Sequence, residues 1–173
     1  MGTHSHHHDY NFSERFEFAG IAKILSLVAI VVGIAAVALG MLSKDHIMVE
    51  RTYANLLLMG YYFTCVCAAG AFFLALQMVT QSAWSAGLIR IPQAMASILP
   101  IASVILLIIV ALGLTSHNLY HHWNAEGLTD PNSPHYDKLV AGKAAFLNVP
   151  GFLIRQILFM GTYSIFAVIL AKL

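Results

Sequence analysis

The chain has 173 residues, 59% of them hydrophobic and only 10% charged, whereas about a quarter of the residues in a soluble domain are charged. This composition excludes an ordinary soluble protein and indicates one that is embedded in a membrane. The formal net charge is +1, and Lys and Arg are scattered singly along the chain, so the charge pattern offers no surface for nucleic acid to bind.

Long stretches without Asp, Glu, Lys or Arg predict the membrane-spanning helices. A helix needs about 20 apolar residues to cross a hydrocarbon core of about 30 Å. We therefore expect an all-α integral membrane protein whose four transmembrane helices form an antiparallel bundle within residues 20–173. The expected spans are about 21–42, 53–80, 94–115 and 149–172. A polar tail, 1–19, precedes them, and a long loop, 116–148, separates the last two.

The tail is rich in histidine and then in phenylalanine, and aromatic residues are typical of the membrane interface. In the first span, small residues recur four positions apart, as in Ala29 with Gly33 and Ala36 with Gly40, which allows another helix to come close. The apolar stretch is longer than the roughly 7 to 15 residues of a cleavable signal peptide. We expect this span to be retained and to serve in packing.

The second span is rich in hydrogen-bonding side chains. Asn55, Tyr62, Thr64 and Gln77 all lie within the apolar stretch. Such groups line pathways in some membrane proteins and join helices in others, and the sequence leaves both interpretations open. If the chain conducts protons, these four residues are the candidates for the path.

A short link joins the second and third spans, so we expect these helices to be antiparallel neighbours. Gly87 suits a helix end, and Pro92 suits the first turn of the next helix. Pro100 lies inside the third span, where its missing N–H predicts a bend.

After the third span comes SHNLYHHWN, residues 116–124. His117 and His121 are four apart, so on a continuing helix they would share a face and form half of a zinc or copper site. A haem in a bundle needs histidines on facing helices, and the first, second and fourth spans contain none. The simpler interpretation is a collar of aromatic and imidazole rings at the headgroups. Because histidine exchanges protons near neutral pH, His117 or His121 is also a candidate for the exit of a proton path.

Metal binding is not expected elsewhere in the chain. Cys65 and Cys67 are two apart and diverge by about 200° on a helix, so they can neither form a disulfide nor hold one ion together. We expect no metal site and no cofactor held by this chain alone.

The long loop contains turn-forming residues at 130–134 and then KLVAGKAAFLN, which predicts a short surface helix. Arg155 falls within the fourth span, where it must reach the interface or pair with a carboxylate. Asp137 is the carboxylate that we favour, and an arginine that reaches the interface alone is the alternative. If the chain itself oxidised quinol, His117, Asp137 and Lys143 would be the available acid–base groups, and none lies deep in a span.

Four phrases of the sequence together resemble the F-type membrane component of bacterial alternative complex III, a quinol:cytochrome c oxidoreductase. They are DYNFSERFEFAGIAKILSL, NLLLMGYYFTCVCAAGAFFLALQMVTQSAWSAGLIRIPQA, SHNLYHHW and SPHYDKLVAGKAAFLNVPGFLIRQ. The resemblance covers nearly the whole chain and extends to the wider group of NrfD-like membrane subunits. It implies a non-catalytic subunit that acts as a scaffold and contributes to a proton half-channel, within a complex whose substrate is quinol or menaquinol.

The resemblance also implies partners and a location. The partners would be a homologous NrfD-like sister subunit, an iron–sulfur subunit, multihaem and monohaem cytochrome c subunits, membrane lipids and a terminal oxidase. Haem c and iron–sulfur clusters are then expected in those partners. The protein would lie in the bacterial inner membrane, with both termini cytoplasmic and the 116–148 loop periplasmic.

Members of this family are about twice as long and have ten helices, so this chain resembles their N-terminal four-helix portion. Two other functions stay open from the residues alone. One is a quinol-binding catalytic subunit, and the other is a small channel or transporter, for which more charge inside the spans or broken helices would be typical.

Overall fold

A computed structural model describes residues 20–116 and 119–172. The elements in this part are α1 (Gly20–Met41), α2 (His46–Thr80), the 3-10 helix η1 (Trp84–Gly87), α3 (Arg90–Thr115), α4 (His121–Asn124), α5 (Lys138–Ala141) and α6 (Val149–Lys172). Within the described ranges, four helices, α1, α2, α3 and α6, are long and apolar enough to cross a membrane. The predicted all-α fold is confirmed. The predicted polar tail at 1–19 lies outside the described residues.

The observed helix bounds agree with the predicted spans most closely for α1 and α6. α3 begins at Arg90 and α2 at His46, both earlier than predicted, because the charge-free stretch marks the apolar part of a helix and not its whole length. Asp45 sets the start of α2. Its backbone is extended, and its carboxylate accepts a 3.0 Å hydrogen bond from the N–H of Ile47, which is the usual way to cap a helix.

The chain divides into two compact units, residues 1–39 and 40–173. The first contains most of α1, whose side chains are apolar around nearly the whole circumference. A Cβ added at Gly33 would meet nothing within 4 Å, so close packing against the described residues does not require glycine there.

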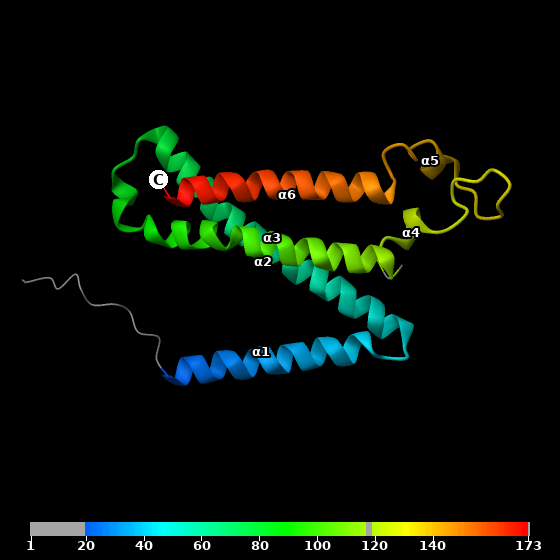
Figure 1. Cartoon of the computed structure of the whole chain (residues 1–173), viewed down its shortest axis with the longest axis horizontal. Coiled ribbons are helices and arrows are strands. Elements are labelled where there is room, and N and C mark those ends of the chain that lie inside the picture. Colours follow the sequence, from blue (N-terminus) through cyan, green and yellow to red (C-terminus); the bar gives the residue numbers. More distant parts are fainter. Residues whose placement is uncertain (1–19, 117–118, 173) are drawn as a thin grey trace, which may run out of the picture. The chain divides into compact units, whose positions relative to one another are not determined.

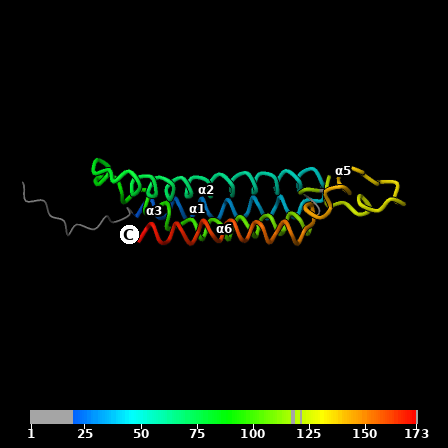
Figure 2. The backbone as a smooth tube through the Cα atoms, turned by 90° about the horizontal axis from the view of Figure 1, so that it is seen from above, coloured from blue at the N-terminus to red at the C-terminus, as the bar shows by residue number. Residues whose placement is uncertain are grey.

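In the second unit, α3 packs against both α2 and α6, whereas α2 and α6 touch each other less. Figure 1 shows the chain running along α2, back along α3 and forward again along α6, with α2 slanting across α3. In the view turned by 90° the same helices again follow one long axis, and the segment that contains α5 lies beyond one end of it (Figure 2). The predicted antiparallel neighbours α2 and α3 are therefore found.

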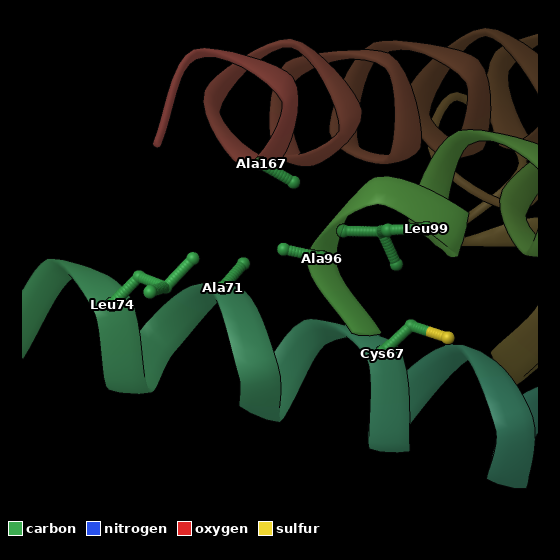
Figure 3. Packing of buried hydrophobic residues seen from close by; sticks show 6 residues of the cluster. All are labelled: Cys67, Ala71, Leu74, Ala96, Leu99 and Ala167. Atoms are coloured by element: carbon green, nitrogen blue, oxygen red, sulfur yellow. The ribbon is translucent and has the colours of Figure 1, made fainter. Parts of the chain in front are cut away.

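The α2–α3 interface, which includes the adjoining part of α6, is the best packed region. Leu74 and Leu99 are each 1% exposed. A Cβ at Gly70 would come within 2.6 Å of Met95 Cβ and 3.0 Å of the Pro92 carbonyl oxygen, so α2 and α3 approach closely only because residue 70 is glycine. Figure 3 shows the buried cluster at this interface, formed by Cys67, Ala71, Leu74, Ala96, Leu99 and Ala167.

Candidate functional site

Hydroxyl groups join α2, α3 and α6 near the middle of the second unit. Thr64 is buried, and its Oγ1 donates to the Gly60 carbonyl of its own helix at 2.8 Å and lies 3.5 Å from the Ala102 carbonyl of α3. The next residue, Ser103, is also buried, and its hydroxyl accepts a 3.2 Å hydrogen bond from Ser164 of α6. These contacts cross both helix interfaces, and such bonds stabilise helix association in membranes.

Gln77 is buried at the end of α2, where its side-chain oxygen accepts a hydrogen bond from the Ser82 hydroxyl. Between them Gln81 adopts the left-handed conformation, with φ of 49°, and ends the helix. Gln77 lies 13 positions after Thr64, which is about 20 Å along the helix axis. Gln77 therefore holds the turn that follows α2 and does not share a site with Thr64.

The other two proton-path candidates of α2 face outward. Tyr62 is 59% exposed, and Asn55 is also exposed. The structure thus places Thr64 and Gln77 inside at different levels and Asn55 and Tyr62 on the surface. Among the described residues these four do not form one continuous chain of hydrogen bonds.

The histidine-rich segment is described only in part. His117 lies outside the described residues, and only the backbone of His121, the first residue of α4, is described. His122 is exposed. The structure therefore leaves the proposed role of His117 and His121 as a prediction.

An aromatic cluster follows the end of α3. The ring centroids of Tyr120, Trp123 and Phe152 lie 5.6 to 5.9 Å from one another. Burial raises the pKa of the Tyr120 phenol above its usual value. The N–H of Leu119 bonds to the Gly113 carbonyl at 3.1 Å and turns the chain back, so that Tyr120 comes to lie against α6. The rings match the collar expected for this segment in composition and in place on the chain.

The expected ion pair between Arg155 and Asp137 does not form among the described residues. The Asp137 carboxylate caps α5 and accepts hydrogen bonds from the N–H groups of Leu139 and Val140 at 2.8 and 3.4 Å. Arg155 donates from Nη2 to the Phe146 carbonyl at 2.7 Å, and its guanidinium carbon lies 3.9 Å from the centre of the Phe146 ring. The loop folds back onto the start of α6, so a carbonyl and a ring reach the guanidinium where a carboxylate was expected.

The same loop end is fastened by Asn148, directly before α6. Its side-chain oxygen accepts a 2.6 Å hydrogen bond from the N–H of Gly151, and its amide nitrogen donates to the carbonyls of Ala144 and Ala145. Lys143 is exposed on this loop. Of the three quinol-site candidates, Asp137 is thus occupied as a helix cap and Lys143 faces outward. The predicted surface helix is present but short, since α5 ends at Ala141.

A groove runs between α2 and α6, with α3 as its floor. It consists of three consecutive hollows of about 420, 410 and 240 Å³. Neighbouring hollows share residues: Tyr61 and Met160 line the first two, and Ala68, Phe72, Leu99 and Tyr163 line the last two. We call this the α2–α6 groove. Tyr120 and Phe152 of the aromatic cluster line the hollow at its loop end, together with Gln156.

The sequence interpretation did not single out Gln156 or Tyr163 of α6. Both lie in the charge-free stretch of the fourth span and line the α2–α6 groove. Their polarity within an apolar stretch was the signal that could have identified them, as it did for Asn55 and Gln77 in α2.

Metal ligands are not gathered in this part of the chain. Within residues 20–116 and 119–172 there is no group of three or more His, Cys, Asp or Glu side chains that could hold an ion together. Cys65 is exposed and Cys67 is buried, so the two thiols point in different directions as predicted.

Taken together, the fold and the distribution of polar groups define a multi-pass, all-helical protein of the membrane type. Comparison with protein-family models gave no match, and comparison with curated proteins gave none either.

Proposed function

We propose that this chain is a scaffold subunit of a respiratory quinol:cytochrome c oxidoreductase of the alternative complex III type. The observation that carries the scaffold role is the use of the buried polar groups. Thr64, Ser103 and Ser164 are engaged with one another's helices, and Gln77 is engaged with the turn after α2. These are groups that hold helices together, and they do not titrate near neutral pH.

The outer surface supports a role inside a larger membrane assembly. Large apolar side chains are exposed along the second unit, for example Phe63 on α2, Ile101 on α3 and Phe166 on α6. Surfaces of this kind are covered by lipid or by other membrane helices. The resemblance to the F-type membrane component supplies the more specific part of the proposal, namely the quinol-oxidising complex, the bacterial inner membrane, and sister, iron–sulfur and cytochrome c subunits as partners.

The proton half-channel is a separate and more demanding proposal. Thr64 and Gln77 are about 20 Å apart along α2, and each is already hydrogen-bonded in the structure. A proton route through this unit therefore needs water or side chains of a partner between the two. The double variant Thr64→Leu, Gln77→Leu tests it: loss of proton release coupled to quinol oxidation supports the route, and unchanged values remove it.

The experiment for the scaffold proposal is purification in a mild detergent through a C-terminal tag. We expect stable copurification with polypeptides that carry haem c and iron–sulfur clusters, detected by the absorption of reduced haem and by electron paramagnetic resonance. Quinol:cytochrome c activity should be recovered in the same fraction. Isolation of the chain alone, or with proteins that carry no redox centre, would contradict the proposal.

A channel or transporter predicts a different result from the same preparation. The isolated chain, reconstituted into lipid vesicles, would then carry a flux of ions or solute without any partner. We expect no flux above that of empty vesicles.

A further inference from the structure

The α2–α6 groove differs from the other large hollow of the second unit in its chemistry. That other hollow, about 500 Å³, lies on the outer side of α2 and α3 and is lined by apolar side chains such as Met59, Phe63 and Ile101, with the thiol of Cys67 beside them. Lipid tails satisfy such a surface completely. The α2–α6 groove instead presents the carboxamide of Gln156 and the hydroxyl of Tyr163.

Gln156 is the group that needs an occupant. It lies seven positions after Val149, about 10 Å into α6. Its side chain makes no hydrogen bond with any described residue, although it is only partly exposed. A carboxamide at this depth gains nothing from lipid tails, which offer neither donor nor acceptor, and therefore favours a neighbour that supplies one.

The length of the groove matches a helix. Along α2 it extends from Ala54 to Ala75, about 32 Å, which is close to the thickness of the hydrocarbon core. Ala54, Ala68 and Ala75 recur at intervals of seven or fourteen, the spacing at which one helix meets another along a seam. Small residues at such positions let a second backbone come close.

We infer that the α2–α6 groove receives one transmembrane helix of a partner subunit, and that this helix carries a hydrogen-bonding side chain at the level of Gln156. The inference rests on the proposed role as a subunit of a membrane assembly. It adds to that role the face that binds, the kind of segment that is bound and the residue that fixes its level. The apolar outer hollow of α2 and α3 is left to lipid.

The test places a photoreactive benzoylphenylalanine at Tyr163, in the groove, or at Ile101, which is exposed on the outer side. Each full-length variant is irradiated in its own membranes, and the attached molecule is identified by mass spectrometry. We expect Tyr163 to attach to one transmembrane segment of a different polypeptide, at one or two adjacent turns. Ile101 should attach to lipid.

Gln156→Leu in the Tyr163 background tests the hydrogen bond. We expect the yield of the cross-link to fall about three- to tenfold, the range for an interhelical hydrogen bond in a membrane. Asn55→Leu is the matched control, because Asn55 is also a carboxamide within a span but lies outside the groove. Equal thermal unfolding of the two variants in detergent shows that the loss is not a loss of folding.

Several results would overturn the inference. They are attachment of Tyr163 to lipid, to a quinone or to any segment of this same polypeptide, and an equal loss in Gln156→Leu and Asn55→Leu. Its failure is distinguishable from failure of the proposed function. A complex with haem and iron–sulfur subunits in which Tyr163 attaches only to lipid would refute the groove alone. A cross-link to a helix of a protein without redox centres would refute the proposed function alone.

Discussion

The α2–α3 interface and the α2–α6 groove are formed by the same helix but are packed very differently. At the interface, Gly70 allows the two backbones to approach, and Leu74 and Leu99 are almost completely covered. In the groove, Phe72 and Tyr163 line an open hollow. The difference teaches that α2 has one face satisfied by its own chain and one face left for another molecule. Substitutions on the two faces should therefore have unequal effects on stability.

The largest expected effect is that of Gly70→Val. Its Cβ would meet Met95 and the backbone oxygen of Pro92, and backbone cannot move aside as a flexible side chain can. We expect the free energy of unfolding to fall by about 3 kcal/mol, as for other overpacked cores. The measurement is a titration with SDS in mixed micelles, followed by tryptophan fluorescence. Gly161→Val is the control, since a Cβ there meets nothing within 4 Å; equal losses in both variants would contradict the close approach.

The next effect is that of Leu74→Ala, which leaves a cavity at the interface. Leu74 is 1% exposed, and we expect a loss of about 2 kcal/mol, the low end for buried leucine because lipid replaces part of the transfer energy. Leu76 lies on the same helix and is 45% exposed, so Leu76→Ala should cost less than about 0.5 kcal/mol in the same titration. If Leu76→Ala costs as much, the contrast between the two faces of α2 is wrong.

A smaller effect is expected for the bond between Ser103 and Ser164. A double-mutant cycle with Ser103→Ala and Ser164→Ala should give a coupling of about 0.6 kcal/mol, the usual value for a hydrogen bond between membrane helices. Ser97 donates only to the Ala94 carbonyl of its own helix, so Ser97→Ala combined with Ser164→Ala should show no coupling. A coupling near zero in the first cycle would mean that α3 and α6 are held by apolar packing alone.

The smallest effect is a change of stability at alkaline pH from Tyr120, at the loop end of the groove. The pKa of this phenol is raised by burial, so the folded state keeps the proton at a pH where the unfolded chain, with a pKa near 10, has lost it. The contribution is complete below about pH 10 and is lost as pH rises through the folded-state pKa. The loss of stability above about pH 10 should therefore be steeper in the wild type than in Tyr120→Phe, as SDS titrations at several pH values would show. Parallel curves would contradict the burial of Tyr120.

The positions of the helices could be predicted from the sequence because the membrane imposes a length and a composition on them. α6 begins at Val149 and ends at Lys172, as predicted. α2 begins earlier than predicted because its first turns, which contain Glu50 and Arg51, are charged and are recognised by the cap at Asp45 and not by hydropathy.

The direction of each polar side chain could not be predicted in the same way. Tyr62 and Thr64 are neighbours in sequence, yet one is exposed and the other buried, because burial depends on where α3 crosses α2. Likewise the partner of Arg155 depends on the path of the loop, which brings Phe146 back to the start of α6. Such contacts are set by tertiary structure and leave no local pattern in the sequence.

The length of α2 has a consequence for the bilayer around the protein. From His46 to Thr80 the helix rises about 50 Å, whereas the hydrocarbon layer is about 30 Å thick. The excess is taken up by oblique insertion and by helix ends that project into the headgroup layers, with the charged first turns as the natural part to project. A bilayer of greater thickness would reduce this mismatch, so the protein should partition toward the thicker regions of a membrane that offers both.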